Sequence, residues 1–230
     1  MPRKTKTLKK TDLKSKKPWL RKRCNSRYPI ENVEPNKIIL IVCEGQTEKH
    51  YFESFPVYGV KIHFEDTKGQ SKQQLITITY HKVKNSKIEY DDVWCVFDMD
   101  VNNGDKEFAD FDNAIQSGIK REYKIAYSND AFELWFYLHY HYITNRENRK
   151  FYYQKLGKIW NINYVKEGKR FNFSKNIYKK LEDDDKASQD QAIRNAEKLF
   201  NLHKNKMYHE QNPVTTVYKL VRYLNNNLRP

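Results

Sequence analysis

The chain has 230 residues and a formal net charge of +14, with 38% hydrophobic and 14% aromatic residues. This composition excludes a largely disordered protein and provides enough apolar material for one large domain or two small ones. No apolar run is long enough to cross a bilayer, and the first residues lack the apolar segment of a secretory signal, so we expect a cytoplasmic protein with no membrane partner.

Most of the net charge lies at the N-terminus. Residues 1–23 contain eleven Lys and Arg residues against Asp12, whereas the other 207 residues carry 32 basic and 28 acidic side chains. We expect residues 1–36 to form a basic arm and linker, disordered when free, that suits phosphate-bearing partners. The alternatives are a solubility tail or a segment packed on an acidic neighbour. The arm residues expected to contact nucleic acid are Lys9, Lys10, Lys14, Lys16, Lys17, Arg21, Lys22 and Arg23.

Residues 37–130 alternate between strand and helix patterns. Four apolar segments indicate strands: KIILIVCEG (37–45), VKIHFED (60–66), DDVWCVFDMD (91–100) and KIAYSND (124–130). Three segments between them indicate helices: TEKHYFESF (47–55), SKQQLITITYHKVKNS (71–86) and KEFADFDNAIQSG (106–118). Ser71 and Gln74 have capping-box spacing, and Gly118 is predicted to end the third helix. The pattern predicts an α/β core with a mostly parallel four-stranded sheet flanked by helices.

Residues 131–230 have a different character, and we expect them to form a helical part packed on the core. Helical spacing of apolar residues extends over three segments: 131–143, 187–204 and 215–227. No strong strand is expected after residue 128. The acidic segment 181–186 is interpreted as a solvated loop.

The three cysteines, Cys24, Cys43 and Cys95, lack the close spacing of a zinc site. Cys43 and Cys95 lie within apolar runs, where a cysteine behaves as a small buried hydrophobe. The pattern indicates free thiols in a reducing compartment.

Acidic residues follow two of the predicted strands. Glu44 ends the first strand, and Asp98 and Asp100 end the third, two positions apart, so their side chains would share a face if the strand continued that far. Like charges held close repel one another unless a cation neutralises them. Hard oxygen ligands favour Mg²⁺ or Mn²⁺. We therefore expect Glu44, Asp98 and Asp100 to hold a metal ion, with solvated acids at strand ends as the alternative.

Several other residues have two open interpretations. Glu48 could join the acidic site or interact with the positive N-terminus of its own helix. Glu133 could reach the same site or form an exposed or salt-bridged helix acid. Lys68, Gly69 and Ser71 lie at a strand-to-helix turn whose backbone N–H groups could hold a phosphate, although an ordinary turn and cap is the alternative. His139 falls on an apolar stripe and is expected to be a packed, hydrogen-bonded histidine.

The sequence resembles the Toprim domain of topoisomerases, bacterial primases and OLD-type nucleases in the pair of motifs CEGQTE (43–48) and FDMD (97–100). It more narrowly resembles the RloB-like family of prokaryotic restriction-linked and phage-defence loci. That resemblance is carried by five ordered blocks: IVCEGQTEKHYF (41–52), KGQSKQQL (68–75), VWCVFDMD (93–100), SNDAFELWFYLHY (128–140) and NPVTTVYKLV (212–221). One departure is Asp130, where the family commonly has proline; we expect this aspartate to cap the following helix.

The resemblance implies a Toprim nuclease that hydrolyses phosphodiester bonds with bound magnesium. In the family pattern, Glu44 matches the glutamate that acts as base or ligand, Asp98 and Asp100 match the metal-binding pair, and Glu48 matches the second acid of its block. A toxic effector in an abortive defence response is the implied role. RNA, including tRNA, fits this role better than DNA. Because no ATP-binding motif is present, a separate ATPase or sensor partner is expected to control the protein.

Two other functions remain open on the sequence. The chain could be a non-catalytic nucleic-acid-binding subunit in which the acids bind a structural ion. It could also nick DNA or pass strands as other Toprim proteins do, which would require a tyrosine nucleophile. With 17 tyrosines and no diagnostic context, the sequence neither identifies such a tyrosine nor excludes one.

Overall fold

The computed structural model describes residues 37–57, 60–66, 71–100 and 105–227, and for 60–66 and Asp105 it describes the backbone alone. The predicted basic arm, Cys24, Lys68 and Gly69 lie outside the described residues. Among the described residues, no helix combines the length and the apolar character that crossing a membrane requires.

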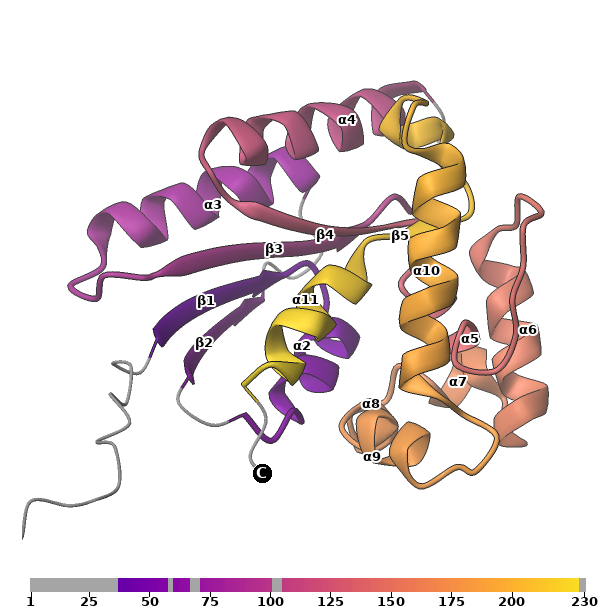
Figure 1. Ribbon diagram of the computed structural model, residues 1–230. Coiled ribbons are helices and arrows are strands. Elements are labelled where there is room, and N and C mark those ends of the chain that lie inside the picture. The colour runs from indigo at the N-terminus through magenta and orange to yellow at the C-terminus, as the bar shows by residue number, and fades with distance from the viewer. Residues whose placement is uncertain (1–36, 58–59, 67–70, 101–104, 228–230) are drawn as a thin grey trace, which may run out of the picture. The chain divides into compact units, whose positions relative to one another are not determined.

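The first half of the described chain alternates between strands and helices, as predicted (Figure 1). Its elements are β1 (Lys37–Cys43), α2 (Gln46–Glu53), β2 (Val60–Asp66), α3 (Lys72–Asn85), β3 (Asp92–Asp98), α4 (Asp105–Lys120) and β4 (Lys124–Asn129). The sheet has the order β2-β1-β3-β4-β5, and its first four strands are parallel. The predicted mixed α/β fold with a mostly parallel sheet is confirmed.

The second half is mainly helical and adds one short strand. Its elements are α5 (Glu133–Tyr137), α6 (Arg149–Trp160), α7 (Tyr164–Glu167), α8 (Phe171–Ser174), α9 (Ile177–Glu182), α10 (Gln189–His203), the 3-10 helix η2 (Tyr208–Glu210), β5 (Val214–Thr215) and α11 (Val217–Asn225). β5 pairs antiparallel with β4, with Thr215 opposite Ser128. This two-residue strand was not predicted, because it is too short to leave an alternating pattern.

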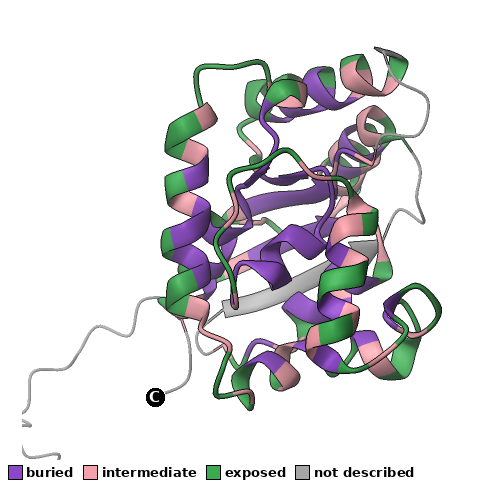
Figure 2. Cartoon of the chain, turned by 90° about the vertical axis from the view of Figure 1, so that its right-hand side faces the viewer, coloured by how far each residue is buried: buried purple, intermediate pink, exposed green. Residues whose placement is uncertain are grey.

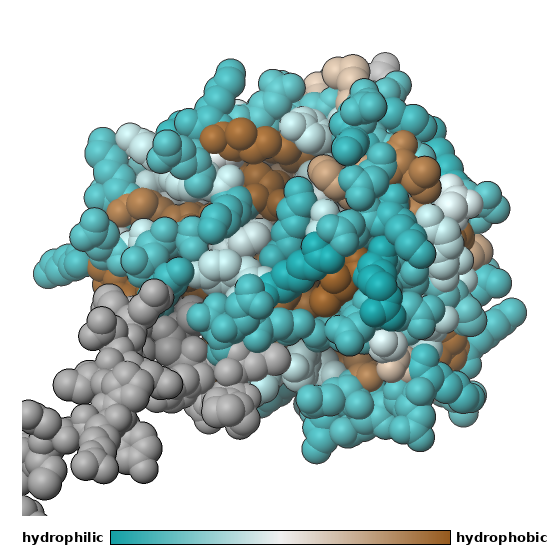
Figure 3. Space-filling model, viewed as in Figure 1, coloured by the Kyte–Doolittle hydropathy of each residue, from teal (hydrophilic) through white to brown (hydrophobic). Residues whose placement is uncertain are grey.

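Helices cover both faces of the sheet: α3 and α4 lie on one face, and α2 and α11 lie on the other (Figure 1). The strand interiors are apolar because both faces are covered, as in β1, where Ile39, Leu40 and Ile41 have no exposed surface. Figure 2 shows this buried interior, and one hydrophobic core includes residues of β1 and of α11. The outer face seen in Figure 3 is mostly hydrophilic, with small separate hydrophobic patches.

Local sequence signals explain some element ends and not others. Ser71 caps α3 as predicted, since its hydroxyl accepts from the Gln74 N–H at 3.2 Å. Gly118 does not end α4, which continues to Lys120; a Cβ at Gly118 would lie 2.5 Å from the Ile125 side chain, so the glycine permits close packing instead. The predicted helix 131–143 is also too long, because α5 ends at Tyr137.

The prediction that Asp130 caps α5 is wrong. Phe132 occupies the position before α5 and makes no side-chain cap. The Asp130 carboxylate instead accepts from the backbone N–H of Arg149, at 2.9 Å, at the start of α6. This residue therefore joins the end of β4 to a helix nineteen positions further along the chain.

An aromatic cluster joins α2 to the C-terminal helices. The Tyr51 ring packs edge-on against Phe52, Phe55, Phe132 and Phe136. Its hydroxyl accepts from the indole N–H of Trp135 at 2.9 Å, and both side chains are buried. This hydrogen bond places a polar pair inside an otherwise apolar contact between the two halves of the fold.

We predict that Tyr51→Phe lowers the free energy of unfolding by about 1–3 kcal/mol, because the buried Trp135 N–H loses its acceptor. Urea denaturation followed by tryptophan fluorescence measures the change. Tyr142→Phe is the control, since Tyr142 is 44% exposed and its hydroxyl can be replaced by water. Equal stability of the two variants would contradict a structural role for the buried pair.

Candidate functional site

The candidate site lies beyond the carboxyl ends of β1 and β3, which are adjacent and parallel. The Glu44 N–H donates to the Val96 carbonyl at 2.9 Å, so the chain leaving β1 stays beside β3. A cavity of about 570 Å³ is present at this edge. Five carboxyl side chains and two cationic side chains contribute to its walls: Glu44, Glu48, Asp98, Asp100, Glu133, Arg149 and Lys169. The five acids proposed from the sequence thus lie around one cavity.

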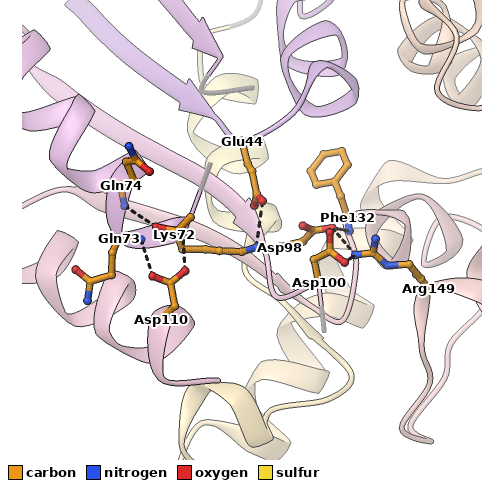
Figure 4. Close-up of polar contacts among 10 residues, drawn as sticks. Glu44, Lys72, Gln73, Gln74, Asp98, Asp100, Asp110, Phe132 and Arg149 are labelled. Atoms are coloured by element: carbon orange, nitrogen blue, oxygen red, sulfur yellow. Dashed lines mark hydrogen bonds and ion pairs between the residues drawn. The ribbon is translucent and has the colours of Figure 1, made fainter. Parts of the chain in front are cut away.

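Glu44 is a buried carboxyl group with only one oxygen paired. Its Oε1 lies 3.1 Å from the Lys72 ammonium, whereas Oε2 is buried and has no hydrogen-bond partner (Figure 4). Burial and the neighbouring Asp98 raise the pKa of Glu44 to about 7, despite the opposing charge of Lys72. The site therefore holds this carboxyl near the point where it exchanges a proton at neutral pH.

Asp98 and Asp100 lie on either side of the end of β3 and share one cationic partner. β3 ends at Asp98, and Asp100 adopts a left-handed backbone conformation with φ 48°, which aspartate tolerates better than most residues. The strand therefore does not continue to Asp100, although both side chains still line the cavity. The Arg149 guanidinium pairs with Asp100 Oδ1 and lies 4.0 Å from Asp98 Oδ2 (Figure 4).

Asp98 is held by both halves of the fold. Its Oδ2 accepts from the Phe132 N–H at 3.3 Å, and burial raises its pKa although Arg149 opposes that change. The Asp100 N–H donates to the Asp130 carbonyl at 3.1 Å. The turn between β4 and α5 therefore positions the acids that follow β3.

Glu48 is a buried member of the site and lies in the first turn of α2. Burial and Asp98 raise its pKa well above the usual value. Gly45 has an extended backbone that any residue can adopt, so this position does not need the backbone freedom of a glycine. A Cβ at Gly45 would lie 2.8 Å from Glu48 Oε2, so the glycine makes room for this carboxyl group. Both interpretations of Glu48 therefore hold, because its side chain lines the cavity and also lies at the N-terminus of its own helix.

Glu133 is not an exposed helix acid. Its side chain is buried, lines the cavity and accepts from the Tyr164 hydroxyl at 3.2 Å. Burial raises the pKa of Glu133, and nearby Lys169 opposes the shift. The helical part thus supplies an acid and a cation to the cavity lining, together with a phenol that donates to the acid.

The turn before α3 shows a cap rather than open backbone donors. The N–H groups of Lys72 and Gln73 donate to the Asp110 carboxylate of α4 at 2.8 and 3.2 Å (Figure 4). Ser71 accepts from the next N–H. A phosphate bound here would have to displace Asp110, so the ordinary turn and cap is the better interpretation of Ser71.

The remaining expectations concern buried side chains outside the cavity. His139 is buried, its Nδ1 lies 2.9 Å from the Trp135 carbonyl, and burial lowers its pKa to about 4, as expected for a packed histidine. Cys43 and Cys95 are buried and form no disulfide within the described residues, as predicted. The segment 181–186 is not wholly a solvated loop, because it begins inside α9 with the buried Leu181, and Asp184 accepts from the Tyr140 hydroxyl at 2.9 Å.

The donor set fits a hard divalent cation. Five carboxyl groups line the cavity, one of their oxygens is buried without a partner, and burial together with mutual repulsion raises the pKa of several of these groups. No three His, Cys, Asp or Glu side chains in the described ranges already stand in a metal-binding arrangement. Lys72 and Arg149 are paired with Glu44 and the two aspartates instead.

Three cations of the site were missed by the sequence analysis: Lys72, Arg149 and Lys169. Lys72 lies inside the KGQSKQQL block, so its position between two motifs was a usable signal. Arg149 and Lys169 lie in a region with no motif, and with 43 Lys and Arg residues in the chain, basic character alone does not distinguish them. Their role depends on how the helical part folds back on the sheet.

Comparisons with known proteins give one match. A family model described as RloB-like protein matches residues 39–224. No curated protein and no solved structure matches the chain significantly. The match includes both the sheet and the helical part that completes the cavity.

We predict that Glu44→Gln stabilises the metal-free protein at about pH 8. The Glu44 pKa is 4.5 in its ordinary state and about 7 in the folded protein, so the folded state binds this proton more tightly than the unfolded chain. The associated stability is present below about pH 4.5 and is lost as pH rises through 7. The neutral variant should be more stable by about 2 kcal/mol at pH 8 and less dependent on pH.

Chemical denaturation with chelator at several pH values between about 5 and 8 measures this effect. Glu53→Gln is the matched control, because Glu53 is exposed and pairs with Lys49 only along its own helix. A Glu44→Gln variant that is less stable than the parent at pH 8 would show that the Lys72 pair outweighs the burial of the charge.

Proposed function

This chain belongs to the RloB-like protein family, and on that premise we propose that it is a metal-dependent nuclease that hydrolyses phosphodiester bonds of nucleic acid. The observation that carries the proposal is the buried carboxylate cluster at the ends of two adjacent parallel strands, in which Glu44 keeps an unpaired oxygen. Such clusters are destabilising for the fold alone, so they are common where a protein binds a cation or performs chemistry.

Glu44, Asp98 and Asp100 are the residues that would hold Mg²⁺ or Mn²⁺. Such an ion, when bound, stabilises charge on a phosphate and lowers the pKa of a coordinated water. The same three positions are those that the resemblance to Toprim nucleases assigns to the metal site. Glu48 and Glu133 line the same cavity and can hold protons or order water beside the metal ligands, because burial raises the pKa of each.

The cavity walls also suit a polyanionic substrate. Arg149 and Lys169 line the cavity, and Lys72 contacts Glu44, which also lines it. The pKa values of Lys72 and Lys169 stay raised although burial opposes this, because the neighbouring carboxylates hold their charges. A phosphodiester entering the cavity would meet these cations, while the acids between them keep the site from binding anions without a metal.

We assign the protein to a toxic role in antiviral defence of a prokaryotic cell, with RNA such as tRNA favoured over DNA as substrate. This assignment rests on the family and on the resemblance stated above. A separate ATPase or sensor protein is proposed to release the activity, since no ATP-binding motif is found in the sequence.

A second candidate is a non-catalytic nucleic-acid-binding subunit. The pairing of Lys72 with Glu44 and of Arg149 with Asp100 favours it, because ion pairs of this kind can balance the acids in a purely structural cluster. The two candidates make different predictions: a nuclease loses cleavage when one of these carboxylates is removed, whereas a binding subunit has no cleavage activity to lose.

We predict that the purified protein cleaves labelled tRNA, other RNA or DNA with Mg²⁺ or Mn²⁺ and not with chelator. Asp98→Asn and Glu44→Gln should each lower the rate about a hundredfold or more, because each removes a charged ligand oxygen. Gel electrophoresis of end-labelled substrates measures the rates. Asp185→Asn is the matched control, since Asp185 is an exposed acid of the 181–186 segment.

Cleavage that is indifferent to metal and to both substitutions would exclude the proposed mechanism. If no nucleic acid is cleaved, the assay is repeated in lysate of cells carrying the surrounding locus, where the proposed sensor is present. Inactivity there too would leave the binding-subunit candidate.

We also predict that deleting residues 1–23 weakens nucleic-acid binding most at low salt, because the deleted segment carries eleven basic residues. Fluorescence anisotropy with labelled RNA at several salt concentrations gives the slope of affinity against salt. The slope should become shallower in the deletion variant. An unchanged affinity at low salt would remove the arm from the substrate-binding surface.

A further inference from the structure

Arg149 occupies a defined place at the edge of the cavity. It is the first residue of α6, and the N-terminus of this helix is capped by Asn148, whose side chain accepts from the Lys150 and Phe151 N–H groups. The Arg149 N–H donates to the Asp130 carboxylate at 2.9 Å. The backbone is therefore fixed by two side chains, while the guanidinium extends from it toward the acids (Figure 4).

The guanidinium is paired at only one of its edges. Its Nη2 contacts Asp100 Oδ1 and lies 4.0 Å from Asp98 Oδ2. Its Nε is buried and has no hydrogen-bond partner. Arginine normally uses its planar donors in parallel on a carboxylate or a phosphate. A guanidinium with a buried unpaired N–H is therefore not in the arrangement that satisfies its donors best.

The two acids that hold Arg149 are the ones assigned to the metal. A divalent ion on Asp98 and Asp100 would place two positive charges beside the guanidinium and take up the oxygens that it uses, so the two cations compete for the same carboxylates. Arg149 lines the cavity with its side chain while its backbone is held by Asp130. The side chain can thus turn into the cavity without unwinding α6.

The other two cations of the site, Lys72 and Lys169, differ from Arg149 in how their nitrogens are paired. Lys72 makes a direct contact with Glu44 at 3.1 Å, and the Lys169 ammonium lies 5.7 Å from the centre of the Tyr153 ring, with Glu133 raising its pKa. Neither has a buried nitrogen without a partner in the part of the chain that the structure describes. Arg149 also has the planar donor geometry that fits two oxygens of one phosphate.

We propose that Arg149 is a phosphate-binding residue of the site, held on Asp98 and Asp100 until a divalent cation takes those carboxylates and frees the guanidinium for the substrate phosphate. This inference rests on the proposed nuclease function. It makes Arg149 a competitor of the metal in the absence of substrate and a ligand of the substrate once metal is bound. Removing the side chain should therefore change metal affinity and cleavage in opposite directions.

The test compares Arg149→Gln, Arg149→Lys and the parent protein in two separate assays. Mn²⁺ binding without nucleic acid is measured by electron paramagnetic resonance of the free ion. Cleavage and binding are measured with labelled tRNA and a short labelled single-stranded RNA, the binding in Ca²⁺ to suppress turnover. Arg222→Gln is the matched control, because Arg222 pairs with Glu197 through two hydrogen bonds on an exposed surface.

We expect Arg149→Gln to bind Mn²⁺ about tenfold more tightly than the parent, because a competing charge is gone. The same variant should cleave about a hundredfold more slowly and bind RNA more weakly in Ca²⁺. Arg149→Lys keeps a charge without the planar fork, so it should show a smaller gain in Mn²⁺ affinity and an intermediate cleavage rate. Arg222→Gln should match the parent in both assays.

Equal or weaker Mn²⁺ binding by Arg149→Gln would overturn the competition, and unchanged cleavage and RNA binding would overturn the phosphate role. If the parent cleaves and Arg149→Gln cleaves equally fast, the nuclease function stands and this inference fails. If the parent binds Mn²⁺ but cleaves none of the probes, RNA binding in Ca²⁺ still decides the phosphate role and the Mn²⁺ comparison still decides the competition, while the nuclease function is decided by the assay in lysate described above. Thermal unfolding of each variant confirms that the compared proteins are folded.

Discussion

The site depends on mutual repulsion between acids at the end of two adjacent parallel strands. β1 and β3 are paired in parallel, so Glu44 and Asp98 lie at the same edge of the sheet, beyond the carboxyl ends of the two strands. The surrounding core excludes the water that would otherwise screen their charges. The fold balances this with Lys72 from α3 and Arg149 from α6. Each cation comes from a different part of the chain, so the cluster is stable only when both parts have folded around the strands.

The helical part therefore completes the site and does not merely cover the sheet. Asp130 illustrates this most directly, because its carbonyl accepts from the Asp100 N–H and its carboxylate accepts from the Arg149 N–H. One residue thus fixes the backbone on both sides of an ion pair. Glu133 lines the cavity and accepts from the Tyr164 hydroxyl, and both side chains are buried.

The sequence predicted the parts of the site that local patterns control. An apolar run ending in an acid specifies where a buried strand stops, so the sequence alone places Glu44 and Asp98 at one edge of the sheet. Arg149 could not, because its partners are 49 and 51 positions away and its own segment has no motif. The short strand β5 could not be predicted either, because its pairing partner β4 is also distant in the sequence.

Gly45 and Asp100 show that the structural role of a motif residue depends on its neighbours in space as well as on its own type. Gly45 is extended, so its backbone does not need a glycine, yet a side chain there would meet the Glu48 carboxyl group. Asp100 is left-handed, so spacing along β3 does not bring it beside Asp98; its backbone contact with Asp130 and the pairing with Arg149 do. At Gly45 the requirement on the residue comes from a neighbouring carboxylate, and at Asp100 it comes from a backbone carbonyl and a guanidinium that hold the acid in place. The acids therefore constrain the backbone around them as much as the backbone positions the acids.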